Sequence, residues 1–130
     1  MRNMNEYITE IKTGKSFDDT VVSLLKSIDK NGWAIFQVID LRDRLAAKDF
    51  SIRPLKIIEI CKASHASKLL SQNSLIAACM PCRLAVFEDD EGVKIISMNP
   101  SAMSNLFDGI DNSLLKIIQS EMNEIMRAVR

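Results

Sequence analysis

Three cysteines and the single histidine of the chain stand at spacings that suit a metal ion. Cys61 precedes His65 by four positions, and Cys79 and Cys82 form a Cys-x2-Cys pair. Three thiolates and one imidazole are a sufficient ligand set for tetrahedral zinc. The four side chains converge if Cys61 and Cys82 lie on neighbouring strands. The spacing therefore predicts a zinc site, or a site for a softer metal held by thiolates, at Cys61, His65, Cys79 and Cys82.

The same cysteines offer a second chemistry, reversible thiol oxidation. The Cys-Met-Pro-Cys sequence that begins at Cys79 has the spacing of an oxidoreductase motif, but it leads into a predicted strand. Such motifs work when a helix N-terminus stabilises the first thiolate. Cys61 is better placed, because a helix is predicted to follow it and Lys62 is adjacent. A bridge from Cys61 to Cys82 needs Cα atoms within about 7 Å. The candidate residues for a ligand or redox site are Cys61, Lys62, Pro81 and Cys82.

A third interpretation is purely structural, with the cysteines as small buried residues and His65 on an exposed helix face. Nucleophilic catalysis needs a base beside Cys61, and His65 is the only histidine. The segment between Cys61 and Cys82 contains no acid that could orient this histidine. The sequence therefore shows no convincing catalytic constellation, and it leaves open whether the chain is an enzyme.

Predicted strands place two of the cysteines at strand ends. Residues 55–60 are rich in β-branched side chains and lead into Cys61, and residues 83–87 follow Cys82. A turn over 89–92, in which Gly92 can adopt a positive φ, connects this strand to a hairpin partner. The remaining strands are predicted at 9–11, 33–39 and 93–98.

Between these strands, apolar residues recur at helical spacing over most of the chain. Ser16 followed by Asp18 and Asp19 is typical of a helix start, with a hydroxyl cap and acids in the first turn. Residues 73–78 are ambiguous and could form a further helical turn. The pattern predicts helices at 17–28, 41–48, 64–70 and from 112 to the C-terminus.

These elements predict one α+β domain over residues 1–130, with two layers and helices packed on one face of a mixed sheet. Three or four strands with helices between them, and a closing hairpin, would form this sheet. The other face of the sheet needs a cover. In a chain of this size, a second copy is the simplest cover, so we expect a homodimer.

Charge and composition narrow the partners and the compartment. Lys plus Arg is 17 and Asp plus Glu is 17, so no net charge draws the chain to nucleic acid or to anionic lipid. No apolar run approaches the roughly 20 residues that cross a bilayer. The polar segment 1–10 lacks the apolar stretch of a signal peptide. An odd number of cysteines argues against a disulfide framework, and we expect a cytoplasmic protein with free thiols.

Several short segments between residues 57 and 100 occur in the same order as the corresponding segments of a known family. In that family a strand ending in cysteine precedes an Ala/Leu helix, a Leu-Pro-Cys turn, a Val-rich strand and an acidic-Gly hairpin. The matching pieces are Ile57–Cys61, Ala66, Leu69-Leu70, Met80–Phe87, Asp90–Val93 and Met98–Pro100. The chain thus resembles the domain of unknown function 302 family, although it has Lys62-Ala63 where the family usually has Asn-Pro. The resemblance implies a two-layer α+β fold that tends to form homodimers, and it implies no established reaction.

Taken together, these features predict a small cytoplasmic, homodimeric binding module of unknown ligand, with the corner formed by Cys61 and Cys82 as its site. The alternative is a redox or metal-binding protein that uses the same two cysteines, with zinc as the possible cofactor.

Overall fold

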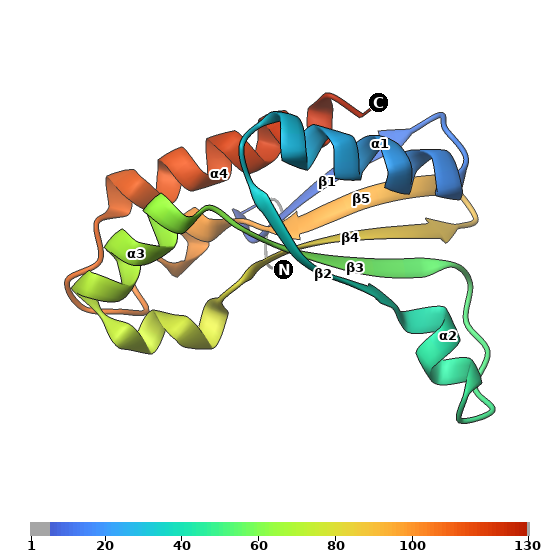
Figure 1. The fold of residues 1–130 in the computed structure, drawn as a ribbon, viewed down its shortest axis with the longest axis horizontal. Helices are drawn as coiled ribbons and strands as arrows, with labels where there is room; N and C mark the ends of the chain where they lie inside the picture. The colour runs from blue at the N-terminus through green and yellow to red at the C-terminus, as the bar shows by residue number, and fades with distance from the viewer. Residues whose placement is uncertain (1–5, 130) are drawn as a thin grey trace.

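The computed structural model describes residues 6–129, so residues 1–5 of the polar N-terminal segment and Arg130 lie outside the described part. Its centre is one five-stranded sheet with the order β1-β5-β4-β3-β2 (Figure 1). The strands are β1 (Ile8–Thr13), β2 (Ala34–Asp40), β3 (Leu55–Cys61), β4 (Cys82–Asp89) and β5 (Gly92–Met98).

Every pair of neighbouring strands in this sheet runs antiparallel. The α+β class is therefore confirmed, but the expectation of a mixed sheet is wrong. The first strand is longer than predicted, because it extends to Thr13 and pairs with β5 along its whole length. This pairing joins residues 80 to 90 positions apart, which local sequence patterns do not report. The hairpin from Asp89 to Gly92 forms as predicted, and Gly92 has a φ of +120°.

The helices are α1 (Phe17–Lys30), α2 (Leu41–Ala46), α3 (Ala63–Gln72) and α4 (Asn112–Arg127), with 3-10 helices η2 (Ser74–Cys79) and η3 (Pro100–Met103). As predicted, the Ser16 hydroxyl caps α1 by accepting a hydrogen bond from the Asp19 N–H at 3.1 Å. The ambiguous segment 73–78 is the 3-10 helix η2. No helix in the part described, 6–129, has the length and apolar content to cross a membrane.

The core lies between one face of the sheet and the two long helices, α1 and α4 (Figure 1). Alternate strand residues such as Ile58, Leu84 and Ile95 are completely buried against these helices. Successive residues of a strand point to opposite faces of the sheet. Ile57, Ala85 and Ile96, which are paired across β3, β4 and β5, therefore lie on the opposite face, where they are only half-buried. The core therefore occupies one face of the sheet, and α3 with η2 extends it beyond the sheet's end.

Candidate functional site

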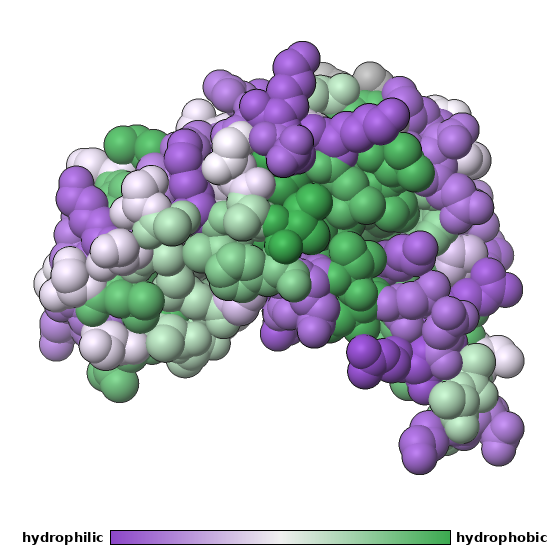
Figure 2. All heavy atoms as spheres, viewed as in Figure 1, coloured by the Kyte–Doolittle hydropathy of each residue, from purple (hydrophilic) through white to green (hydrophobic). Residues whose placement is uncertain are grey.

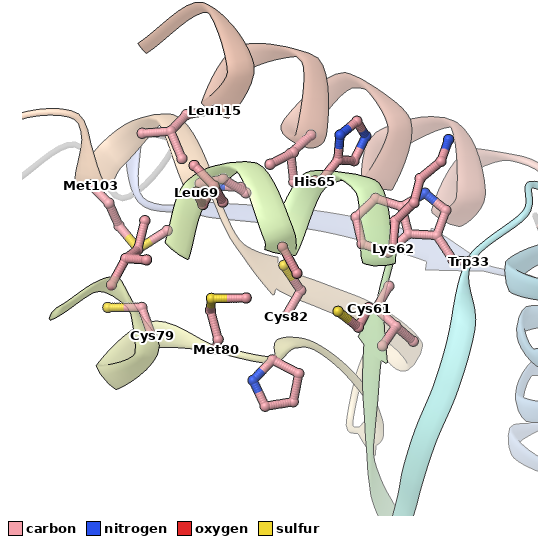
Figure 3. A pocket seen from close by; sticks show the side chains of 16 residues that line it. Trp33, Cys61, Lys62, His65, Leu69, Cys79, Met80, Cys82, Met103 and Leu115 are labelled. Atoms are coloured by element: carbon pink, nitrogen blue, oxygen red, sulfur yellow. The ribbon is translucent and has the colours of Figure 1, made fainter. Parts of the chain in front are cut away.

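A small apolar cavity lies where β3 ends and β4 begins, closed by α3, η2, η3 and α4 (Figure 3). Its volume is about 30 Å³, which by this measure corresponds to about two water molecules. Almost all of its lining surface is apolar. Residues from six elements line it, and half of the sixteen belong to the connection between β3 and β4: Lys62, His65, Ala66, Leu69, Ile76, Cys79, Met80 and Pro81.

All three cysteines line this cavity. Cys61 is the last residue of β3 and Cys82 is the first residue of β4. The two strands are neighbours, and Ile60 is the register partner of Cys82, so Cys61 and Cys82 lie diagonally across the ladder. Cys79 ends η2, and most of its side chain faces solvent. The three thiols are free.

The electrostatics of the thiols oppose an activated cysteine. Burial, together with the neighbouring Cys61, raises the pKa of Cys82 to about 11. Burial also raises the pKa of Cys61. Both thiols are therefore protonated at neutral pH, whereas redox and nucleophilic cysteines rely on a lowered pKa. The position of Cys61 before α3 does not overcome the loss of solvent.

Two methionines add to the sulfur content of the cavity wall. The side chains of Met80 and Met103 line the same space as the cysteines (Figure 3). Thioethers are flexible and polarisable, so they fit ligands of irregular shape. The cavity is therefore an apolar, sulfur-lined site with walls that can adapt.

A cluster of polar groups centred on Glu121 of α4 stands at the rim of this cavity. Its carboxylate accepts hydrogen bonds from Lys62 Nζ at 3.0 Å and from Trp33 Nε1 at 3.3 Å. His65 Nε2 lies 2.7 Å from the other carboxylate oxygen. The rings of Trp33 and His65 meet edge to face, with centroids 5.9 Å apart. These contacts join the start of β2, the start of α3 and the middle of α4.

The Glu121 carboxylate is kept ionised by its neighbours. Partial burial acts to raise the pKa of Glu121, but the hydrogen bonds from Lys62 and His65 outweigh this effect and hold the pKa below its usual value. The rim therefore carries a fixed negative charge that is satisfied by an ammonium and two ring N–H groups. Lys62, which the sequence pointed to as a partner of Cys61, is bound to Glu121 instead.

The predicted metal ligands line one cavity but do not form a ligand set. Within residues 6–129, no three His, Cys, Asp or Glu side chains are arranged to hold a metal ion. The interpretation of His65 as an exposed helix residue is wrong, because its side chain is only 16% exposed and faces Glu121. The imidazole is held by that carboxylate rather than directed at the thiols.

Sequence reasoning missed Glu121. One signal was present, since Glu121 falls at helical spacing among the apolar positions Leu114, Ile118 and Ile125, which are buried in α4. An acid on the buried side of a helix needs partners. Its partners come from positions 33, 62 and 65, so the sequence alone could not identify them.

A wider groove adjoins the cavity at the Met80–Pro81 segment. Its volume is about 360 Å³. Cys79, Met80, Pro81, Cys82, Pro100 and Met103 line both spaces, and Met98, Met122 and Arg83 line the groove alone. The Met80–Pro81 segment therefore borders both the small apolar cavity and the wider groove. Arg83 at the groove is bound to Glu59 at 3.1 Å.

Comparison with known proteins identifies the fold and the family. A crystal structure of an uncharacterized conserved DUF302 protein from Bacillus stearothermophilus matches with a TM-score of 0.87. The match covers 95% of this chain and 98% of that chain at 19% sequence identity, so it shows a shared fold. No curated protein matches the sequence. The family model for the domain of unknown function DUF302 matches residues 8–129, nearly the whole chain. The resemblance seen in the sequence is therefore confirmed, and the chain belongs to the DUF302 family.

Proposed function

We propose that this chain is a cytoplasmic, homodimeric binding module whose ligand site is the sulfur-lined cavity, and that the ligand presents a small apolar end. The observation that carries this proposal is the composition of the cavity, which has an apolar wall and a polar cluster only at its rim. Binding sites for small molecules commonly combine an apolar lining with a few polar groups.

The size of the cavity limits what it accepts. A space of about 30 Å³ holds the end of an aliphatic chain of two or three carbons. A longer chain continues into the groove when Met80 changes rotamer, because the Met80–Pro81 segment borders both spaces. An elongated apolar ligand therefore suits this site better than a compact polar one.

Two further features support the proposed cytoplasmic location and the proposed homodimer. All three cysteines are free, which suits a reducing compartment. Apolar side chains remain exposed on β2 and half-buried on the open face of the sheet, and a second copy of the chain is suited to cover such surfaces. A redox role is the weaker candidate, because burial raises the pKa of both Cys61 and Cys82.

A series of n-alkanols from butanol to decanol tests the ligand proposal. Trp33 is the only tryptophan of the chain and lines the cavity, so its fluorescence reports binding. We expect affinity to rise with each added methylene by about 0.8 kcal/mol, until the chain fills the site and the gain ends. A flat response across the series, with no change in melting temperature, would falsify the proposal.

A pair of substitutions on α3 distinguishes binding in the cavity from nonspecific binding elsewhere on the chain. Ala66 lines the cavity, and Ala63, one turn earlier on the same helix, is exposed and does not. We expect Ala66→Phe to occupy the cavity and abolish the response of Trp33 to octanol. Ala63→Phe adds the same side chain outside the cavity and leaves the response unchanged.

A further inference from the structure

The two edges of the sheet differ in the way that they are protected. The outer strand β1 carries Glu10 and Lys12, charges of the kind that prevent edge-to-edge association. The opposite edge strand, β2, has the sequence Ala-Ile-Phe-Gln-Val-Ile from Ala34 to Ile39, without a charge. An apolar edge strand of this kind is a place where another chain binds.

Side chains along this unprotected edge are exposed. Ile35 is 39% exposed, Phe36 63% and Val38 41%. Val22 of α1 is 49% exposed. We call these four residues the α1–β2 edge. Figure 2 shows hydrophobic residues gathered over the part of the surface where α1 and β2 lie.

The position of Val22 follows from the packing of α1. The Ser27 hydroxyl donates a hydrogen bond to the Ile125 carbonyl, so this side of α1 faces α4. Val22 is five residues from Ser27, which places it on nearly the opposite side of the helix. α1 also contacts β2, and Val22, which faces away from α4, is exposed. Asp18 and Asp40 line one shallow hollow, so the start of α1 lies beside the end of β2.

The charges that flank Val22 have a two-fold pattern. Asp18, Val22 and Lys26 follow one another at intervals of four residues and share one side of α1. All three are exposed. An antiparallel copy of this stripe, related by a two-fold axis at Val22, brings Val22 against itself. It also brings each Asp18 opposite the Lys26 of the other copy, so the stripe is complementary to itself.

We infer that a second copy of this chain docks on the α1–β2 edge about a two-fold axis through Val22, with Asp18 of each copy facing Lys26 of the other. The inference rests on the proposed homodimer and deepens it by naming the interface. It differs from the arrangement that the sequence suggested, in which the second copy covers the open face of the sheet. Isologous contacts of this kind are typical of two-fold dimers.

The bulge in β2 is compatible with this interface. The register of β2 on β3 shifts between Ile35 and Gln37, which leaves Phe36 as an extra residue. Such a bulge interrupts a regular backbone ladder. The contact is therefore made by side-chain packing of Phe36 and Val38 on the partner and by the paired α1 helices.

Charge reversal tests the two-fold pattern directly. We would measure the dimer dissociation constant by sedimentation velocity for the full chain, for Asp18→Lys, for Lys26→Asp and for the double variant. Each single reversal turns two attractive pairs of the dimer into repulsive ones, and we expect the constant to rise by about tenfold or more. The double variant restores both pairs, and we expect its constant to return to within about threefold of the parent value.

Three results would overturn the interface. One is a dimer dissociation constant that neither single charge reversal changes. Another is a double variant whose dimer dissociates as readily as the dimers of the single variants. The third is dissociation by Met98→Glu, on the open side of the sheet, without an effect of Val22→Asp. A parent chain that is monomeric at all concentrations would instead overturn the homodimer itself. Circular dichroism of each variant confirms that α1 remains folded.

Discussion

His65 Nε2 and Glu121 Oε2 lie 2.7 Å apart, although 56 positions separate the two residues in the chain. This contact ties the first turn of α3 to the middle of α4 above the sulfur-lined cavity. Lys62 and Trp33 donate to the other oxygen of the same carboxylate. A single acid therefore fixes the position of three elements that form the cavity rim.

Replacing this acid is expected to loosen the rim. In Glu121→Gln the negative charge that pairs with Lys62 and His65 is lost, and the hydrogen bonds that remain go to an uncharged amide and are weaker. We expect a loss of about 1–2 kcal/mol in the free energy of unfolding, since the carboxylate is largely but not fully shielded. Urea unfolding followed by Trp33 fluorescence measures this loss. Glu124→Gln, one turn further on α4 and exposed, is the matched control and should change stability by less than about 0.5 kcal/mol.

The stabilising effect of Glu121 should depend on pH. Its pKa in the folded chain lies below the usual 4.5, so the unfolded chain binds more protons in the acidic range. The contribution is complete above the unfolded pKa and is lost as pH falls through the lowered folded pKa. We expect the stability gap between the parent chain and Glu121→Gln to narrow between about pH 5 and pH 3. A gap that widens on acidification would contradict a lowered pKa of Glu121 in the folded chain.

Much of the architecture was predictable because its determinants are local. The cap of α1 by Ser16 and the hairpin closed by Gly92 depend on residues a few positions apart, and both form as expected. The order of the strands depends on the pairing of β1 with β5, for which no short-range signal exists. The consecutive strands β2 to β5 also pair antiparallel to one another, and the expectation of a mixed sheet missed this.

The cavity could be predicted in part for the same reason. Cys61 and Cys82 were placed together because the strands that hold them were recognised. The zinc hypothesis assumed that His65 faces the cysteines, and this depends on how α3 packs against α4. Glu121 supplies the stronger partner for the imidazole, and spacing within the segment 61–82 contains no information about it.

Thiol modification should follow exposure and pKa. Cys79 is exposed, whereas burial raises the pKa of Cys82 to about 11. At pH 7 only about one Cys82 thiol in ten thousand is then ionised. We expect iodoacetamide to modify Cys79 first, and modification of Cys82 to accelerate by about tenfold per pH unit up to pH 10. Peptide mass spectrometry at timed intervals gives both rates. A Cys82 that reacts as fast as Cys79 at pH 7 would revive the redox interpretation.

Metal analysis decides the zinc hypothesis. Because His65 is bound to Glu121, we expect the purified chain to contain far less than one zinc per molecule. A chelator should leave its melting temperature unchanged, since structural zinc contributes binding energy directly to folding. Zinc near one per chain, together with thiols that react only after chelation, would instead assign Cys61, His65, Cys79 and Cys82 as ligands.

The connection between β3 and β4 joins two strands that are direct neighbours, yet it supplies half of the sixteen residues of the cavity wall. Half of the cavity wall is therefore encoded in one contiguous stretch of the gene, and the other half comes from the scaffold. A library that randomises codons only within 62–81 would change half of the cavity wall while leaving the residues of all five strands unchanged.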